Sequence, residues 1–163
     1  TYRYQDGLLQ VEKEQLNLEE MVRTVLNTEL KHLIAQKKHS IELLFAEETQ
    51  LVPMDYLHMY RVIYNLILNA TEYTPEAGCI QVQTTYTDNQ VTLSVVDNGV
   101  GIPQDKLELL FNPYTTMGKR VRHKGSGLGL FLAKQIIELH EGNIAVESTE
   151  NQGSRFMIKL PLV

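Results

Sequence analysis

The sequence predicts an α+β fold, a two-layer α/β sandwich in which a mixed, mostly antiparallel sheet is covered on one face by helices. The main observation is that helical patterns alternate with pairs of strand patterns rather than with single strands, and strands joined by short turns pair antiparallel. The length of 163 residues corresponds to about one domain. The longest apolar stretch, residues 62–70, is interrupted by asparagine and is too short to cross a membrane.

The first third of the chain predicts an extended segment, a long helix and a strand. Residues 8–16 are typical of a strand or a linker. Asn17 is a suitable N-cap for a helix over residues 18–38, where apolar side chains recur near helical spacing. The short segment SIELLFA, residues 40–46, predicts a strand.

The middle of the chain predicts a second helix and a hairpin. Pro53 and Asp55 indicate the start of a helix that covers residues 56–73. Two strands follow over residues 79–87 and 90–97, and the Asp-Asn pair between them favours a turn.

The last third predicts two helices and a final hairpin. A short helix is expected over residues 105–111, and residues 112–124 are irregular. A glycine-led helix covers residues 127–141 and stops at a glycine. Strands over residues 143–149 and 154–162 then complete the sheet.

The charge of the chain is unevenly distributed. The net charge is −5, yet the segment KRVRHK, residues 119–124, holds four of the 15 Lys and Arg residues and no acid. The rest of the chain therefore carries 11 basic residues against 20 acidic ones. This balance argues against a broad nucleic-acid surface. The basic segment could hold one compact anion, or it could be a solvated loop.

The single cysteine and the first residue bear on the protein's setting. Cys79 has no partner for an internal disulfide, which fits a reducing compartment, and we expect it to have a core or edge role in its strand. The chain begins with Thr1 and has no signal-peptide pattern. We therefore expect a piece of a longer protein.

Three glycines, Gly125, Gly127 and Gly129, introduce the last helix. Their spacing matches neither the P-loop nor the dinucleotide fingerprint, whose third glycine would stand at Leu130. Bare backbone at a helix N-terminus lets N–H groups approach an anion closely. The alternative is a flexible hinge before a helix.

A second glycine cluster follows a carboxylate. In VVDNGVGIP, Asp97 ends an apolar strand, and Gly99 and Gly101 come directly after it. A carboxylate in this position suits a ligand that donates a hydrogen bond. Asp-Asn-Gly is equally an ordinary turn sequence.

The helix over residues 56–73 carries polar side chains among apolar ones. Asn65 and Asn69 are one turn apart and share a face. A buried asparagine must have its amide satisfied, and its carboxamide oxygen suits magnesium bound beside phosphates. Both side chains could instead bond to nearby backbone.

Taken together, these stretches resemble the catalytic ATP-binding domain of sensor histidine kinases, in the superfamily that includes DNA gyrase and a class of ATP-dependent chaperones. NLILNATEYTP resembles the family's asparagine box, DNGVGI its first glycine box, LFNPY its phenylalanine box and GSGLGL its second glycine box. NQGSRF resembles the last glycine-containing box. Five boxes in the right order are a specific combination, although each alone is weak.

The resemblance implies that the chain binds ATP with Mg²⁺. It implies that Asn69 coordinates the metal, that Asn65 supports the phosphates, and that Asp97 accepts the exocyclic amine of adenine. The other implied contacts with the nucleotide or its lid are Glu72, Tyr73, Gly99, Gly101, Ile102, Phe111, Lys119, Arg120, Arg122, Lys124, Gly125, Ser126, Gly127, Leu128, Gly129, Leu130 and Ser154.

The resemblance also implies a domain organisation. Residues 1–16 correspond to the linker after a dimerisation region, and residues 17–163 to the ATP-binding domain. Phe111 would anchor an ATP lid over about residues 112–124. The expected partners are the protein's own upstream dimerisation and phosphoacceptor domain, in a full-length homodimer, and a response regulator. The expected location is the cytoplasm, where the domain could be the cytoplasmic part of a membrane-anchored sensor.

Two departures from the family pattern leave alternatives open. Sensor kinases commonly have a basic residue where Glu72 stands, so a serine kinase that regulates a sigma factor is a close alternative. None of the five histidines has the context of a phosphoacceptor, so the acceptor is expected upstream. An ATP-hydrolysing clamp or chaperone would carry glutamate in place of Asn65, because such enzymes need a general base. A binding module without turnover is a further alternative.

Overall fold

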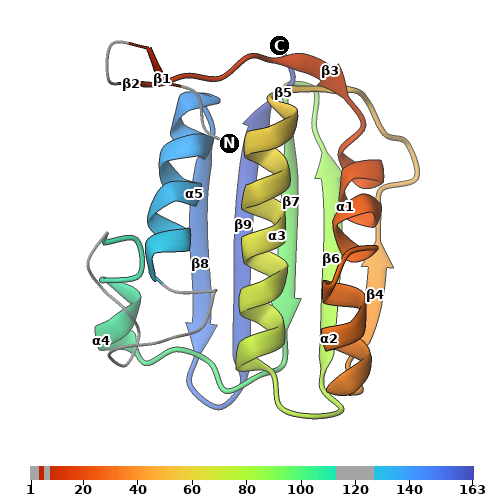
Figure 1. The fold of residues 1–163 in the computed structure, drawn as a ribbon, viewed down its shortest axis with the longest axis vertical. Helices are drawn as coiled ribbons and strands as arrows, with labels where there is room; N and C mark the ends of the chain where they lie inside the picture. The colour runs from red at the N-terminus through yellow and green to blue at the C-terminus, as the bar shows by residue number, and fades with distance from the viewer. Residues whose placement is uncertain (1–3, 6–7, 113–126) are drawn as a thin grey trace.

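The computed structural model describes residues 4–5, 8–112 and 127–163, and it has two layers (Figure 1). The helices lie on one face of a five-stranded sheet, with α3 in front of its middle strands. The predicted α+β sandwich is thus confirmed. The helices are α1 (Leu18–Leu26), α2 (Leu30–Gln36), α3 (Tyr56–Tyr73), α4 (Gln104–Leu107) and α5 (Gly127–Leu139).

The main sheet has the strand order β4-β6-β7-β9-β8. Only the β4–β6 pair is parallel, so the sheet is mixed and mostly antiparallel, as predicted. Along β6, Ile80 and Val82 are fully buried while Gln81 and Gln83 are partly exposed, because successive side chains point to opposite faces. The bounds are β4 (Ser40–Leu44), β6 (Cys79–Tyr86), β7 (Gln90–Asp97), β8 (Asn143–Thr149) and β9 (Gly153–Pro161).

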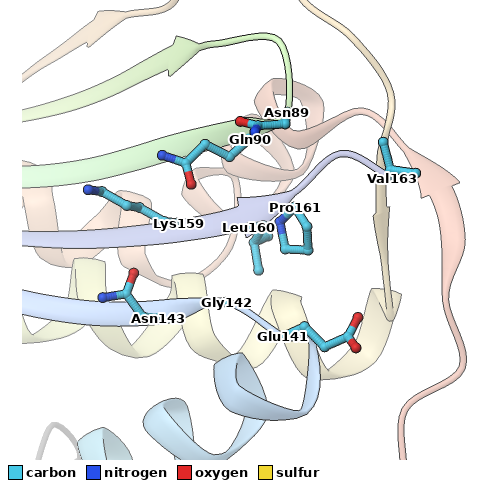
Figure 2. A pocket seen from close by; sticks show the side chains of 9 residues that line it. All are labelled: Asn89, Gln90, Glu141, Gly142, Asn143, Lys159, Leu160, Pro161 and Val163. Carbon is cyan, nitrogen blue, oxygen red and sulfur yellow. The ribbon is translucent and has the colours of Figure 1, made fainter.

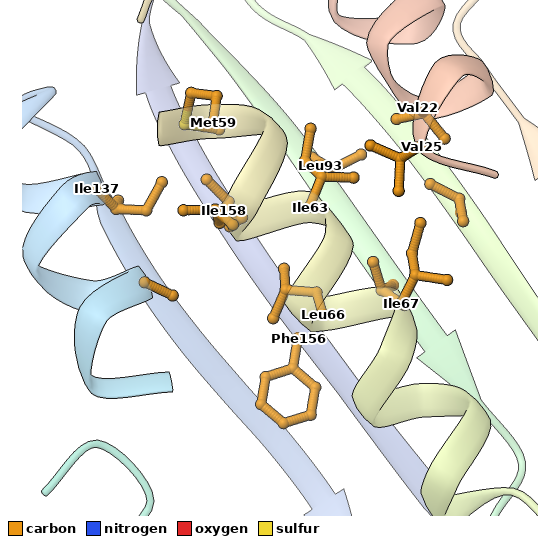
Figure 3. Close-up of a cluster of buried hydrophobic side chains, with 14 of the residues drawn as sticks. Val22, Val25, Met59, Ile63, Leu66, Ile67, Leu93, Ile137, Phe156 and Ile158 are labelled. Atoms are coloured by element: carbon orange, nitrogen blue, oxygen red, sulfur yellow. The ribbon is translucent and has the colours of Figure 1, made fainter. Parts of the chain in front are cut away.

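The hydrophobic core lies between α3 and the sheet (Figure 3). Ile63, Leu66 and Ile67 of α3 are completely buried and face the strands and the flanking helices. Leu93 of β7 and Ile158 of β9 are 1% exposed on the opposite side of this layer. Burying so many aliphatic side chains fixes the face that α3 turns to the sheet, and therefore also the face that its polar residues take.

The long helix predicted over residues 18–38 is wrong in one respect: the structure divides it into α1 and α2. Asn17 caps α1 as predicted, accepting a hydrogen bond from the N–H of Glu20 at 2.8 Å. The division falls at Asn27 and Thr28, where the Thr28 hydroxyl donates to the Val25 carbonyl at 2.7 Å and accepts from the N–H of Leu30 at 3.3 Å. Such side-chain bonds compete with a continuous helical ladder.

The start of α3 also differs from the prediction. Asp55 is the N-cap and accepts from the N–H of His58 at 3.1 Å, as expected. Pro53, however, lies in a strand, β5 (Val52–Met54), which pairs antiparallel with β3 (Glu14–Leu16). The segment over residues 14–16 is thereby tied to the domain. A second short pair joins β1 (Tyr4–Gln5) to β2 (Leu8–Leu9).

Apart from α4, the remaining helices and strands of the main sheet lie within two residues of their predicted bounds. α4 is shorter than the predicted helix over residues 105–111. Within the described parts of the chain, none of the helices combines the length and the apolar character that a membrane crossing requires.

Candidate functional site

The predicted site residues belong to elements that meet at one end of the molecule. In Figure 1 the C-terminal end of α3, the end of β7 and the turn between β8 and β9 lie at the lower end of the view, with α4 beside them. The first turn of α5 faces the same end. Segments as far apart in sequence as Tyr73 and Asn151 are therefore neighbours here.

On α3, the two asparagines differ in exposure. Asn65 is half-buried and Asn69 is 2% exposed. Among the described residues, the carboxamide oxygen Oδ1 of Asn69 has no hydrogen-bond partner. A buried oxygen without a partner carries a free-energy cost that a bound ligand can remove. An amide oxygen is also a ligand that Mg²⁺ accepts, so this atom fits a divalent cation.

Glu72 and Tyr73 continue the same end of α3, and both are half-buried. Burial raises the pKa of the Tyr73 hydroxyl, and the nearby charge of Glu72 raises it further. Tyr73 therefore stays neutral and can donate a hydrogen bond at physiological pH.

Asp97 ends β7 and is only 6% exposed. Its Oδ1 accepts from the N–H of Gly99 at 2.9 Å, and the N–H of Ser154 also donates to the carboxylate. Burial raises the pKa of Asp97, while these two N–H groups and the charge of His39 act in the opposite direction. The side chain is thus a buried acceptor held in a fixed orientation.

Two glycines let the loop after β7 pass close to its neighbours. A Cβ at position 99 would lie 2.2 Å from the Tyr73 carbonyl oxygen. Gly101 has φ +72°, and a Cβ there would lie 2.1 Å from the Thr149 carbonyl oxygen. Any larger residue at either position would push the loop away from α3 or from β8.

Hydrogen bonds then fasten this loop to both sides of the site. The N–H of Val100 donates to the Tyr73 carbonyl at 3.1 Å, and the N–H of Asn151 donates to the Val100 carbonyl at 2.6 Å. The N–H of Ile102 donates to the hydroxyl of Ser148 at 2.8 Å. The end of α3, the loop after β7 and the β8–β9 hairpin consequently form one connected structure.

The Ser148 hydroxyl is the centre of this connection, and sequence reasoning missed it. It donates to the Gly153 carbonyl at 3.0 Å and lies 2.8 Å from the Ser154 hydroxyl. Its bond to Ile102 joins residues 46 positions apart, and an isolated serine in a strand gives no sequence signal for such a contact. Sequence reasoning also missed His39 and Thr74, because their contact joins residues 35 positions apart and leaves no local pattern.

A hollow of about 320 Å³ opens beside the loop. It brings together three of the predicted residues, Tyr73, Gly101 and Ile102. Asn69 and Asp97 do not line it. Its lining is completed by Val100, Pro103, Lys106, Glu150 and Asn151.

The remaining predicted residues fall into two groups. Phe111 is half-buried against the core, with the ammonium of Lys134 5.9 Å from its ring centre, and Leu130 is 3% exposed. Gly127, Leu128 and Gly129 open α5. The predicted contacts that lie outside the described residues are Lys119, Arg120, Arg122, Lys124, Gly125 and Ser126.

A second hollow, of about 480 Å³, lies at the opposite end of the sheet (Figure 2). Lys159 and Leu160 of β9, Gln90 of β7 and Asn143 of β8 line it. It contains none of the predicted site residues and is separate from the site described above.

Comparison with known proteins matches this chain to an ATPase family and to sensor kinases. The family model described as histidine kinase-, DNA gyrase B- and HSP90-like ATPase matches residues 54–163. The alginate biosynthesis sensor protein KinB of Pseudomonas aeruginosa is 35% identical over 160 residues, which cover 98% of this chain and 26% of KinB. The adaptive-response sensory kinase SasA of Gloeothece citriformis is 43% identical over 103 residues, 63% of this chain and 26% of SasA.

Solved structures are similar over nearly the whole chain. The catalytic domain of histidine kinase ThkA has a TM-score of 0.82 and 30% identity, covering 93% of this chain and 97% of that domain. A structure of ThkA in complex with the response regulator TrrA has a TM-score of 0.79 and 27% identity, covering 94% of this chain and 42% of that one.

Proposed function

Because the chain belongs to the histidine kinase-, DNA gyrase B- and HSP90-like ATPase family, which binds ATP, we propose that it binds ATP with Mg²⁺ and donates the γ-phosphate to a histidine. The acceptor would lie in a dimerisation domain outside this chain. The chain spans about a quarter of the length of KinB and SasA, at 26% of each.

The observation that carries the proposal is the buried oxygen of Asn69, which has no hydrogen-bond partner within the part of the chain that the structure describes. In this proposal Asn69 Oδ1 holds Mg²⁺, and Asn65, one turn earlier on the same face, supports the phosphates. When bound, the cation neutralises charge on the phosphate oxygens of the nucleotide.

The adenine base would be bound by Asp97. An ionised carboxylate can only accept hydrogen bonds, so it suits the exocyclic amine of adenine and disfavours the carbonyl of guanine. Its orientation is already fixed by the N–H groups of Gly99 and Ser154. Tyr73, Gly101 and Ile102, which line the adjacent hollow, would contact the base.

The phosphates would lie toward the first turn of α5. The N-terminus of a helix presents free N–H groups and a positive dipole end, and it favours anions. The basic residues Lys119, Arg120, Arg122 and Lys124 belong to the proposed lid over residues 112–124 and would add positive charge. The domain thus contributes positioning and charge neutralisation, while the acceptor's own surroundings supply the base.

The alternatives are less well supported. A hydrolase of this superfamily would need a general base, and the amide of Asn65 cannot accept a proton at neutral pH. Glu72 is compatible with a serine kinase, because sensor kinases commonly have a basic residue at its position. The relatives named above, however, are a sensor protein and a sensory kinase. The similar solved domain belongs to the histidine kinase ThkA, and this name favours transfer to histidine.

A partner and a location complete the proposal. The ThkA structure contains a response regulator, so we propose that a response regulator receives the phosphate from the acceptor histidine here too. The full-length protein would be a homodimer, and this domain would face the cytoplasm, where ATP is available.

A phosphotransfer assay tests the proposal. The chain is mixed with the dimerisation domain of its own full-length protein and with ATP labelled at the γ-phosphate. We expect a label on one histidine of that domain, labile in acid and stable in base, and none on the chain alone. Asn69→Ala should abolish transfer, whereas Asn143→Ala, an exposed asparagine at the far end of the sheet, should not. An acid-stable phosphoserine or rapid steady hydrolysis by the chain alone would contradict the proposal.

A further inference from the structure

The C-terminal end of α3 is held by two side chains from the connection between α2 and β4. The ammonium of Lys37 donates to the Thr71 carbonyl at 2.5 Å. The imidazole Nε2 of His39 lies 2.9 Å from the Thr74 carbonyl oxygen and 3.1 Å from that of Pro75. The last carbonyls of a helix have no partner within the helix, so these bonds supply partners for the Thr71 and Thr74 carbonyls. The Pro75 carbonyl lies beyond α3 and also accepts from the N–H of Gly78 at 3.1 Å.

The partners of His39 determine where its proton lies. Both are carbonyl oxygens, which only accept, so Nε2 must carry the hydrogen and donate it. The other ring nitrogen, Nδ1, is buried and has no hydrogen-bond partner among the described residues. His39 is 8% exposed. Its ring is oriented by the two bonds to the Thr74 and Pro75 carbonyls.

Thr74 connects this contact to the candidate site. It follows Tyr73, whose carbonyl receives the N–H of Val100 and lies against Gly99. On the other side, a Cβ at Gly78 would lie 2.3 Å from the Thr74 methyl group and 3.0 Å from Oδ1 of Asn98. A shift of Thr74 would therefore move both Tyr73 and the loop that follows Asp97.

We propose that His39 is a positioning residue for the base-binding side of the nucleotide site: its Nε2–H, shared between the Thr74 and Pro75 carbonyls, fixes Tyr73 and Asp97 in the geometry that selects adenine. This inference rests on the proposed function, because it assumes that Asp97 receives the adenine amine.

The test compares variants that keep or remove the donor at the Nε2 position. His39→Phe keeps a ring and removes the N–H, while His39→Gln carries an amide donor near the position of Nε2. Dissociation constants for ATP, GTP and inorganic triphosphate, each with Mg²⁺, are measured by calorimetry for both variants. His32→Phe is the matched control, because His32 is an exposed histidine of α2.

We expect His39→Phe to weaken ATP binding by about threefold to tenfold, the effect of one lost hydrogen bond. GTP and triphosphate binding should stay within error, so the preference for ATP over GTP falls by the same factor. His39→Gln should recover most of the loss. If His39→Phe does not fold, His39→Asn replaces it, because its shorter side chain carries the same amide without reaching the two carbonyls.

Two results would overturn the inference: an unchanged ATP-to-GTP preference in the folded variant, or equal losses for ATP and triphosphate, which would indicate a purely structural role. Asp97→Ala separates this inference from the proposed function. If the wild type has no preference for ATP, or Asp97→Ala keeps that preference, the proposed base site is wrong. If Asp97→Ala loses the preference and His39→Phe keeps it, only the role of His39 is wrong.

Discussion

At the scale of single residues, the site is marked by buried polar atoms rather than by exposed charge. Asn69 and Asp97 are 2% and 6% exposed. The carboxylate is fixed by two N–H groups, whereas the amide oxygen has no partner among the described residues. The Asn69 oxygen is thus available for a ligand, and the Asp97 carboxylate is oriented for one.

Asn69→Ala should remove the dependence of nucleotide binding on magnesium. The neutral amide oxygen needs the metal in order to hold the phosphates, so the variant loses the gain in affinity that Mg²⁺ gives the wild type. Calorimetric titration of ATP with and without Mg²⁺ measures this gain. Asn143→Ala should keep it. An undiminished gain in Asn69→Ala would remove the metal role.

Asp97→Ala should weaken ATP binding by about 5- to 150-fold, because an unpaired amine costs about 1–3 kcal/mol. Asp97→Asn keeps one acceptor and should lose less. In the wild type, burial raises the pKa of Asp97, so ATP affinity should fall as the pH is lowered through that value and the carboxylate is protonated. Titrations over a pH series measure this. A folded Asp97→Ala with wild-type affinity would show that the base binds elsewhere.

At the scale of elements, a buried cluster joins the start of α3 to the end of α5. The N–H of Asp55 donates to Nε2 of His140 at 3.0 Å, and Nδ1 of His140 donates to the Ile136 carbonyl at 2.8 Å. Asp55 also accepts from the N–H of Glu12 at 2.7 Å, which fastens the N-terminal segment at the same point. The imidazole must be neutral, because its Nε2 accepts a hydrogen bond.

This cluster predicts that the free energy of unfolding decreases in mild acid. Burial lowers the pKa of His140 below its ordinary value of 6.5. Between that value and the lowered pKa, the imidazole is protonated in the unfolded chain and neutral in the folded one. Stability is therefore lost as the pH falls from about 6.5 toward the lowered pKa, at up to about 1.4 kcal/mol per pH unit.

Urea denaturation at several pH values measures this slope. His140→Gln can still accept from the N–H of Asp55 and does not titrate, so it should show a smaller slope between pH 6.5 and the lowered pKa. His32→Gln, an exposed histidine, should keep the wild-type slope. Equal slopes for wild type and His140→Gln would contradict this role.

At the scale of the whole molecule, an acidic domain carries one basic segment. The net charge is −5, although residues 119–124 contain four basic side chains and no acid. Such a distribution attracts an anion to one place while the rest of the surface repels it.

Replacing the basic side chains of this segment should weaken the binding of ATP and GTP equally, because their charge acts on the phosphates and not on the base. The variant replaces Lys119, Arg120, Arg122 and Lys124 with Gln. We expect a loss of about tenfold or more in each affinity, since several charges near a polyanion each contribute on the order of 1 kcal/mol.

The matched control makes the same change in net charge elsewhere. It replaces four exposed lysines with Gln, namely Lys13, Lys31, Lys38 and Lys159. The control should lose little affinity, because screening by salt weakens the effect of distant surface charges. Equal losses in both variants would mean that net charge alone acts. If the first variant loses no affinity for ATP or GTP, the segment is a solvated loop that does not act on the phosphates.

The sequence by itself determined the layers of this protein and most of their elements. The period of the apolar residues predicts the helix over residues 56–73 and the two hairpins, because local periodicity decides which face is buried. It also made Asn69 and Asp97 candidate site residues, since each stands in a short motif whose residue types limit its chemistry. The break at Asn27 and the strand around Pro53 escaped prediction, because a local pattern does not show what a segment will pair with.

Only the tertiary structure decided how these motifs are connected. It left Asn69 Oδ1 buried without a partner among the described residues, and it set Ser148 between the loop after β7 and the last hairpin. It also joined His39 to the end of α3, across 35 positions of sequence. These contacts depend on burial and on hydrogen bonds between distant segments, which exist only once the helices have packed against the sheet.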